Sequence, residues 1–160
     1  TLRKTPAWAA WQGRDRTFMP QEDFAELVEE RLIDFAEPAG AVMLELAQTF
    51  KATTKVDFES TRRLKSGETT LEYREATEAT AGKKGTVAVP DTFTLALQPF
   101  EGSDAYRVPV RFRYRIRDSR LTLGYVIERP EELVRSAFAD VCEFVGSNID
   151  VDIWSGKPET

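Results

Sequence analysis

The sequence predicts an α+β fold, in which an antiparallel sheet of about five strands carries helices on its apolar face. The hydrophobic residues first repeat at helical spacing, change near Thr54 to the alternation of β-strands, and return to helical spacing after Pro130. Helices and strands therefore occupy separate blocks of the chain. Such segregation is typical of α+β folds rather than of alternating βαβ units.

Two tryptophans lie near the start of the chain. Trp8 and Trp11 are three residues apart, a spacing that places both on one face of a short helix. We expect this helix to cap one end of the core. The alternative is that the two rings form a stacking platform for bases or for a partner.

Two further helices are predicted before the strands. Pro20 is typical of a first helical position, and Pro38 and Gly40 separate this helix from a second one that runs to about Lys51. The first helix alternates apolar and acidic positions, which predicts one buried and one solvated face. Its apolar residues are Phe24, Leu27, Val28, Leu32 and Phe35, and its acidic residues are Glu22, Asp23, Glu26, Glu29 and Glu30.

The strand region begins with a hairpin whose tight turn is predicted at Ser66-Gly67. Pairing about this turn places Lys65 opposite Glu68 and Glu59 opposite Arg74. Opposite charges that face each other across strands are mildly stabilising. We therefore expect the polar face of this first hairpin to be neutralised by its own residues.

A second hairpin, Val110–Ile127, is the firmest element of the prediction. With a turn at Asp118-Ser119, every pair on one side is apolar, and a slip by one residue would bury arginines. The apolar pattern therefore fixes the register. The expected apolar pairs are Ile116 with Leu121, Tyr114 with Leu123, Phe112 with Tyr125, and Val110 with Ile127.

The other side of the second hairpin carries arginines. The expected pairs are Arg117 with Arg120, Arg115 with Thr122, Arg113 with Gly124, and Arg111 with Val126. Like charges directly opposite each other are unfavourable, and this face of the hairpin holds no carboxylate. A neighbouring strand over residues 87–98, in which Pro90 indicates an edge, a bulge or a late start, would add only small neutral residues.

Three interpretations of the arginine side remain open. The planar fork of arginine suits phosphate and carboxylate groups, which favours an anionic partner such as nucleic acid. The acidic helix 22–34 or the acidic first hairpin could instead cover the arginines, in the same chain or in a second subunit. The side could also be merely solvated. The candidate binding residues are Arg111, Arg113, Arg115, Arg117 and Arg120, with Lys83 and Lys84 from the loop 76–86.

A last helix is predicted from Pro130 to Gly146, and Cys142 lies beside its apolar stripe as a small core or boundary residue rather than a nucleophile. We expect residues 1–147 to form one α+β domain, and residues 148–160 to form a tail that adds a strand or reaches a partner. Because the first residue is Thr, we expect this domain to be part of a longer protein. The inward positions of the helix are Leu133, Ala137, Phe138, Val141, Phe144 and Val145.

The composition excludes several classes of function. The chain of 160 residues contains no histidine and one cysteine, which excludes Ser-His-Asp and Cys-His catalysis, an intrachain disulfide and a plausible zinc site. An enzyme would have to use carboxylates such as Glu26 and Glu30, and we expect no enzymatic activity, metal or cofactor. No apolar run reaches the length of a membrane span. The net charge of −5 argues against broad affinity for nucleic acid.

Whole segments of the chain, between about Thr5 and Val145, resemble a known family. They include the runs FAELVEERLIDFAEPAGAVMLELAQTFKA, RLKSGETTLEYRE, YRVPVRFRYRIRD and LTLGYVIERPE. These runs resemble the YfdQ-like family of phage and prophage proteins, whose function is unknown. The resemblance implies a phage or prophage product that works in the bacterial cytoplasm or in the phage particle, and it supplies no catalytic or binding residues.

The function that we expect is therefore that of a non-enzymatic phage accessory or structural protein. It would act by self-association, as a homo-oligomer, or by binding another phage protein, without a cofactor or a membrane. The alternative is an accessory protein that binds nucleic acid through the arginine-lined sheet face. Binding of that kind weakens steeply with salt.

Overall fold

The computed structural model describes residues 2–63, 69–81, 87–118, 120–149 and 156, with the backbone alone for 53–63 and 69–80. The elements are α1 (Pro6–Gly13), β1 (Phe18–Pro20), α2 (Gln21–Glu30), the 3₁₀ helix η1 (Leu32–Asp34), β2 (Phe35–Glu37), α3 (Gly40–Thr49), β3 (Lys51–Arg63), β4 (Thr69–Thr80), β5 (Thr92–Leu97), β6 (Tyr106–Arg117), β7 (Arg120–Ile127) and α4 (Pro130–Asn148). None of the helices in this described part has the length and hydropathy that crossing a membrane requires.

The α+β prediction is confirmed, with five antiparallel strands in the order β1-β7-β6-β5-β2. The membership of the sheet differs from the prediction, because β3 and β4 pair only with each other in a separate two-stranded sheet. The short strands β1 and β2, and not the first hairpin, occupy the two edge positions of the sheet. Each has three residues, too few for a periodic pattern to reveal it.

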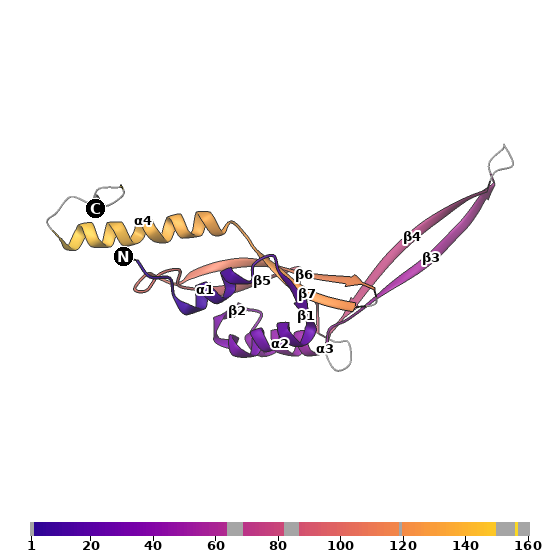
Figure 1. Cartoon of the computed structure of the whole chain (residues 1–160), viewed down its shortest axis with the longest axis horizontal. Coiled ribbons are helices and arrows are strands. Elements are labelled where there is room, and N and C mark those ends of the chain that lie inside the picture. The colour runs from indigo at the N-terminus through magenta and orange to yellow at the C-terminus, as the bar shows by residue number, and fades with distance from the viewer. Residues whose placement is uncertain (1, 64–68, 82–86, 119, 150–155, 157–160) are drawn as a thin grey trace.

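The β3–β4 ribbon extends away from the five-stranded sheet, as Figure 1 shows. Its register corrects the predicted charge pairing, because Glu59 lies opposite Glu72 and Arg74 lies opposite Asp57. The last pair of the ribbon is Arg63 opposite Thr69, and the register is irregular between Glu59 and Arg62. The turn predicted at Ser66-Gly67 accounts for neither feature. The predicted pair of Lys65 and Glu68 lies outside the described residues.

Helices α2 and α3 lie on the apolar side of the five-stranded sheet (Figure 1). The ring of Phe112 on β6 lies 5.7 Å from that of Phe24 on α2 and 5.6 Å from that of Phe50, directly after α3. Helix α2 ends at Glu30, earlier than predicted, and Leu32 and Phe35 belong to η1 and β2. Both side chains still pack on the core, so the apolar pattern predicted burial better than it predicted the end of the helix.

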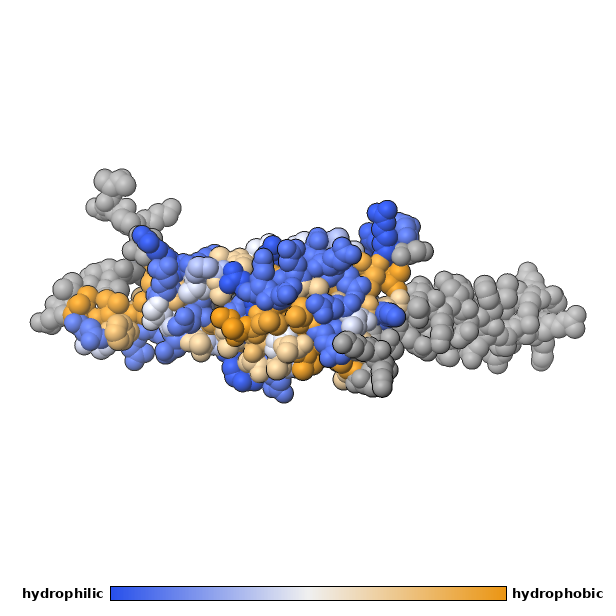
Figure 2. Space-filling view, turned by 90° about the horizontal axis from the view of Figure 1, so that it is seen from below, coloured by the Kyte–Doolittle hydropathy of each residue, from blue (hydrophilic) through white to orange (hydrophobic). Residues whose placement is uncertain are grey.

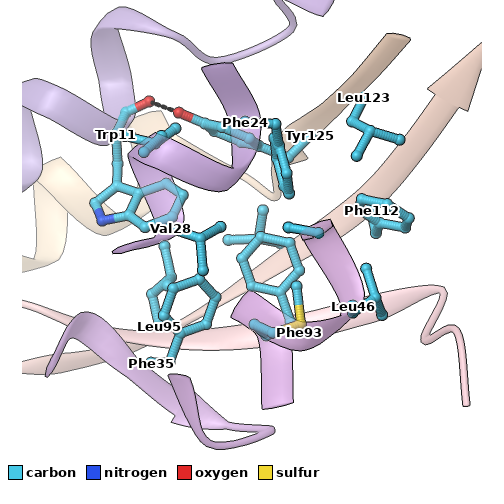
Figure 3. Packing of buried hydrophobic residues seen from close by; sticks show 14 of the residues in the cluster. Trp11, Phe24, Val28, Phe35, Leu46, Phe93, Leu95, Phe112, Leu123 and Tyr125 are labelled. Carbon is cyan, nitrogen blue, oxygen red and sulfur yellow. Dashed lines mark hydrogen bonds between the residues drawn. The ribbon is translucent and has the colours of Figure 1, made fainter. Parts of the chain in front are cut away.

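The two tryptophans of α1 are completely buried, which contradicts the alternative of an exposed stacking platform. Helix α1 begins at Pro6, where the hydroxyl of Thr5 accepts a hydrogen bond from the backbone N–H of Trp8. Trp11 donates its indole N–H to the buried carboxylate of Asp34 at 2.8 Å. Its carbonyl oxygen accepts the hydroxyl of Tyr125 at 2.6 Å, as Figure 3 shows. The tryptophans therefore cap the core, as expected.

Helix α4 corrects the predicted inward stripe. Ala137 is buried, but Phe138 and Phe144 are 51% and 68% exposed. Figure 1 gives the reason, because the helix runs on past the end of the sheet and its second half leaves the body of the protein. The helix also continues through Gly146 to Asn148. Of the tail predicted over residues 148–160 to add a strand or to reach a partner, Asn148 belongs to α4, and residues 150–155 and 157–160 lie outside the described residues.

Candidate anion-binding site on the outer face of the sheet

The register of the second hairpin agrees with the prediction at every pair. Val110 lies opposite Ile127, and the pairing continues to Arg117 opposite Arg120 at the tip. The apolar side chains of β6 and β7 enter the core, where Val110 and Leu123 are completely buried. Side chains alternate along a strand, so the arginines project from the opposite side of the sheet, which we call the outer face.

Strand β5 is the neighbour of β6 on the other flank, as predicted. Thr92 lies opposite Arg111, and Ala96 lies opposite Arg107, so this strand adds small neutral residues to the outer face. The strand begins at Thr92, two residues after Pro90. Of the three alternatives that Pro90 left open, the late strand start is the one that the structure has.

The acidic helix that, in one of the three interpretations, could cover the arginines lies on the other side of the sheet. Phe24 of α2 packs against Phe112 on the apolar side, and the acidic residues of α2 face solvent there. Neutralisation of the arginines by this helix within one chain is therefore wrong. The periodicity predicted the apolar face of the helix, but not which side of the sheet would receive it.

One end of the outer face is neutralised by carboxylates that the sequence reasoning missed. Arg111 Nε lies 2.8 Å from Glu128 Oε1, and Arg107 Nη2 lies 3.4 Å from Glu37 Oε2. Glu128 directly follows β7, and its backbone N–H bonds to the carbonyl of Pro109, which brings it beside Arg111. The predicted hairpin ended at Ile127, one residue before Glu128, so its pattern did not include this carboxylate. Arg111 is thus an ion-paired residue at the border of the candidate site.

The other end of the face is cationic. Among the described residues, no carboxylate lies within ion-pair distance of the arginines near the hairpin tip. The four arginines near the hairpin tip are all exposed, and we refer to them as the cationic tip: Arg113, Arg115, Arg117 and Arg120. Lys83 and Lys84 lie outside the described residues, so the structure does not place them relative to the tip.

An aromatic ring that the prediction did not include lies within the cationic tip. The guanidinium carbon of Arg115 lies over the ring of Phe18 on β1, 4.1 Å from its centroid. Phe18 pairs with Gly124, and a β-carbon at position 124 would come within 2.6 Å of the carbonyl oxygen of Thr17. Gly124 therefore permits the close approach of β1, which brings Phe18 to the arginines.

Among the hollows that the described residues form, two contain charged side chains that the sequence analysis considered. One of about 500 Å³ borders the neutralised end and mixes Arg16, Arg111 and Arg129 with Glu128 and Glu131, so its charge is nearly balanced. The other, of about 330 Å³, contains Glu26 and Glu30, the carboxylates that an enzyme would have to use. Within the described part of the chain, no group of three or more metal-ligating side chains is close enough to hold an ion.

The comparisons with known proteins give one match. The family model for an uncharacterized conserved protein (DUF2303) matches residues 1–158. No curated protein and no solved structure matches the chain. Since the family model covers nearly all of the sequence, the chain belongs to the DUF2303 family of uncharacterized conserved proteins.

Proposed function

We propose that this protein binds nucleic acid through the cationic tip of its outer sheet face. The observation that carries the proposal is the grouping of Arg113, Arg115, Arg117 and Arg120 on one exposed face without a described carboxylate partner. Like charges held together on a sheet are unfavourable unless a partner neutralises them. Arginine binds phosphate oxygens in a bidentate manner, which makes a phosphate chain a suitable partner.

The spacing of the arginines supports a linear polyanion. Arg113, Arg115 and Arg117 alternate along β6, so their Cα atoms are about 7 Å apart. Long arginine side chains at this interval can reach successive groups along a nucleic-acid backbone. A folded protein partner would have to present carboxylates at the same interval.

The acidic total charge is compatible with this function because the charges are separated in space. The exposed acidic residues of α2 lie on the opposite side of the sheet from the arginines. A phosphate chain on the outer face is therefore kept at a distance from them by the sheet and the core. The separated charges would orient the protein, so that only one face approaches the nucleic acid.

The cellular setting of the proposal comes from the resemblance to the YfdQ-like phage and prophage proteins. We place this protein among the non-enzymatic accessory proteins of a phage or prophage, acting in the host cytoplasm or in the particle. Nucleic acid is the substrate that such a protein meets in both places. The proposal requires no cofactor.

A titration tests the proposal. Labelled single-stranded and double-stranded DNA and RNA are titrated with the wild type at two salt concentrations, and with the double variant Arg113→Gln/Arg117→Gln. We expect binding at low salt that weakens at higher salt and in the variant. The matched control is Arg135→Gln, which removes an exposed arginine from α4. Absence of binding to every nucleic acid at low salt would overturn the proposal.

A second candidate function is self-association through α4, with a second copy of this chain as the partner. Phe138, Phe144 and Val145 on this helix and Ile149 directly after it are exposed, and Figure 2 shows hydrophobic surface at the end of the molecule that the helix occupies. Among the described residues, the hydrogen bond that Tyr106 donates to Asp140 is the one tertiary hydrogen bond or ion pair in the second half of α4. A helical segment with so little tertiary support is marginal in water. Most soluble oligomers pair identical surfaces about a two-fold axis, which would cover both helices together.

Light scattering across a concentration series tests this second candidate. We expect the apparent mass of the wild type to rise with concentration, and the double variant Phe138→Ser/Phe144→Ser to stay monomeric. Ile33→Ser is the matched control, since Ile33 is 94% exposed in η1. A wild type that remains monomeric at the highest concentration would exclude self-association.

A further inference from the structure

We infer that Arg115, supported by Phe18, stacks on a base rather than binding a phosphate, and that the bound nucleic acid is therefore single-stranded. The inference rests on the proposed function and adds the class of nucleic acid to it. It gives Arg115 a different role from Arg113 and Arg117, although the alternation along the strand places all three in equivalent positions.

The position of Phe18 is fixed by backbone contacts. Strand β1 pairs with β7 so that Phe18 lies opposite Gly124. The segment before it is anchored, because the N–H of Arg16 donates to the carbonyl of Tyr125 at 2.9 Å. The missing side chain at Gly124 leaves room for this approach. The ring is half-buried against the sheet and forms a fixed support for a side chain above it.

Arg115 is the member of the cationic tip that lies over this support. Its guanidinium carbon is 4.1 Å from the ring centroid, the geometry of a cation–π contact. One side of the guanidinium group is thus covered by the ring, while the residue as a whole remains exposed. The other side is open to a planar group, and bases stack on arginine planes and aromatic rings in single-stranded complexes.

The neighbours of Arg115 complete a phosphate–base–phosphate arrangement. Arg113 and Arg117 flank it on the same strand and the same face, with no described aromatic ring beneath either. They remain available for phosphates on both sides of the stacked base. Bases in a duplex are stacked on each other and paired, so they cannot reach a platform on a sheet. A single strand can turn a base towards it.

The experiment compares two single strands of equal length and charge, one with thymine bases and one with abasic sites throughout. Both are titrated with the wild type, with Arg115→Lys and with Phe18→Leu. Lysine keeps the charge but lacks the plane, and leucine keeps much of the apolar volume but lacks the ring. We expect the wild type to bind the thymine strand about tenfold more tightly than the abasic strand. In both variants this preference falls towards one, while affinity for the abasic strand is retained.

The outcomes separate the inference from the proposed function. Equal affinity of the wild type for both strands overturns base stacking and leaves phosphate binding in place. A preference that survives in both variants, whose folding is verified by thermal unfolding, overturns the role of Arg115 and Phe18. Failure of the wild type to bind either strand overturns the proposed function, and the inference falls with it.

Discussion

Arg117 and Arg120 lie directly opposite each other at the tip of the β6–β7 hairpin, and neither has a carboxylate partner among the described residues. Two like charges in this position destabilise the hairpin. The apolar pairs beneath them hold the register in spite of the repulsion. We therefore expect this pair to lower the stability of the hairpin and to strengthen its binding of anions.

Arg120→Glu should raise stability and weaken nucleic-acid binding at the same time. The substitution turns a repulsive cross-strand pair into an attractive one, and we expect a gain of a few tenths to about 1 kcal/mol in the free energy of unfolding. Urea unfolding and oligonucleotide titration measure the two effects. Arg135→Glu on α4 makes the same change of charge away from the tip and should leave binding nearly unchanged. A destabilised Arg120→Glu variant would contradict the pairing.

Gly124→Ala should destabilise the protein by roughly 1–3 kcal/mol. The added β-carbon would come within 2.6 Å of the carbonyl oxygen of Thr17, and backbone must shift to relieve the contact. Gly13→Ala is the control, because nothing lies within 4 Å of a β-carbon at that position. Urea unfolding of both variants is the measurement. Equal stability of the two variants would show that β1 does not approach Gly124 as closely as described.

Substitution of a phenylalanine should lower the free energy of unfolding strongly in the core and hardly at all in α4. Phe93 is 1% exposed, and Phe93→Ala is expected to cost about 3–5 kcal/mol. Phe144 is 68% exposed, so Phe144→Ala should change the stability of the monomer by no more than about 0.5 kcal/mol. Thermal unfolding at a low protein concentration tests the contrast. A large loss in Phe144→Ala under these conditions would mean that α4 packs on its own body.

High pH should destabilise the protein from about pH 10 upwards. The hydrogen bond to Asp140, together with burial and nearby carboxylates, raises the pKa of Tyr106 to about 12. Burial, with the charge of Asp15, raises the pKa of Tyr125 well above its ordinary value. The unfolded chain loses these protons first, so their contribution to stability is complete below about pH 10 and is lost as the pH rises towards 12.

Urea unfolding at a series of pH values checks this dependence. Tyr125→Phe has no proton to lose at this position, so its stability should decline less steeply above pH 10 than that of the wild type. A wild type whose stability is constant or rises between pH 10 and 12 would contradict the environment described for these two tyrosines.

The hairpin of β6 and β7 could be predicted from the sequence because its two faces differ at every position. The same pattern was weaker in β3 and β4, where the register depends on a turn and an irregularity that alternation does not reveal. The edge strands were missed because three residues show no period. Local pattern therefore predicted the centre of the sheet and failed at its edges.

The candidate site was predicted in part for the same reason. The arginines share a strand and a face, so alternation alone placed Arg113, Arg115 and Arg117 together. Phe18 and Glu128 reach them through β1 and through the segment after β7, by contacts between parts of the chain that no local pattern links. The one signal that could have identified Phe18 is Gly124, whose missing side chain indicates a close backbone approach.

The central claim is tested most directly by the salt dependence of binding to a single-stranded oligonucleotide. The logarithm of the binding constant is plotted against the logarithm of the salt concentration for the wild type, Arg113→Gln/Arg117→Gln and Arg135→Gln. Each phosphate contact contributes about 0.7 to the slope, so the double variant should lose about 1.4 while Arg135→Gln keeps the slope of the wild type. An unchanged slope in the double variant would contradict phosphate binding by the cationic tip.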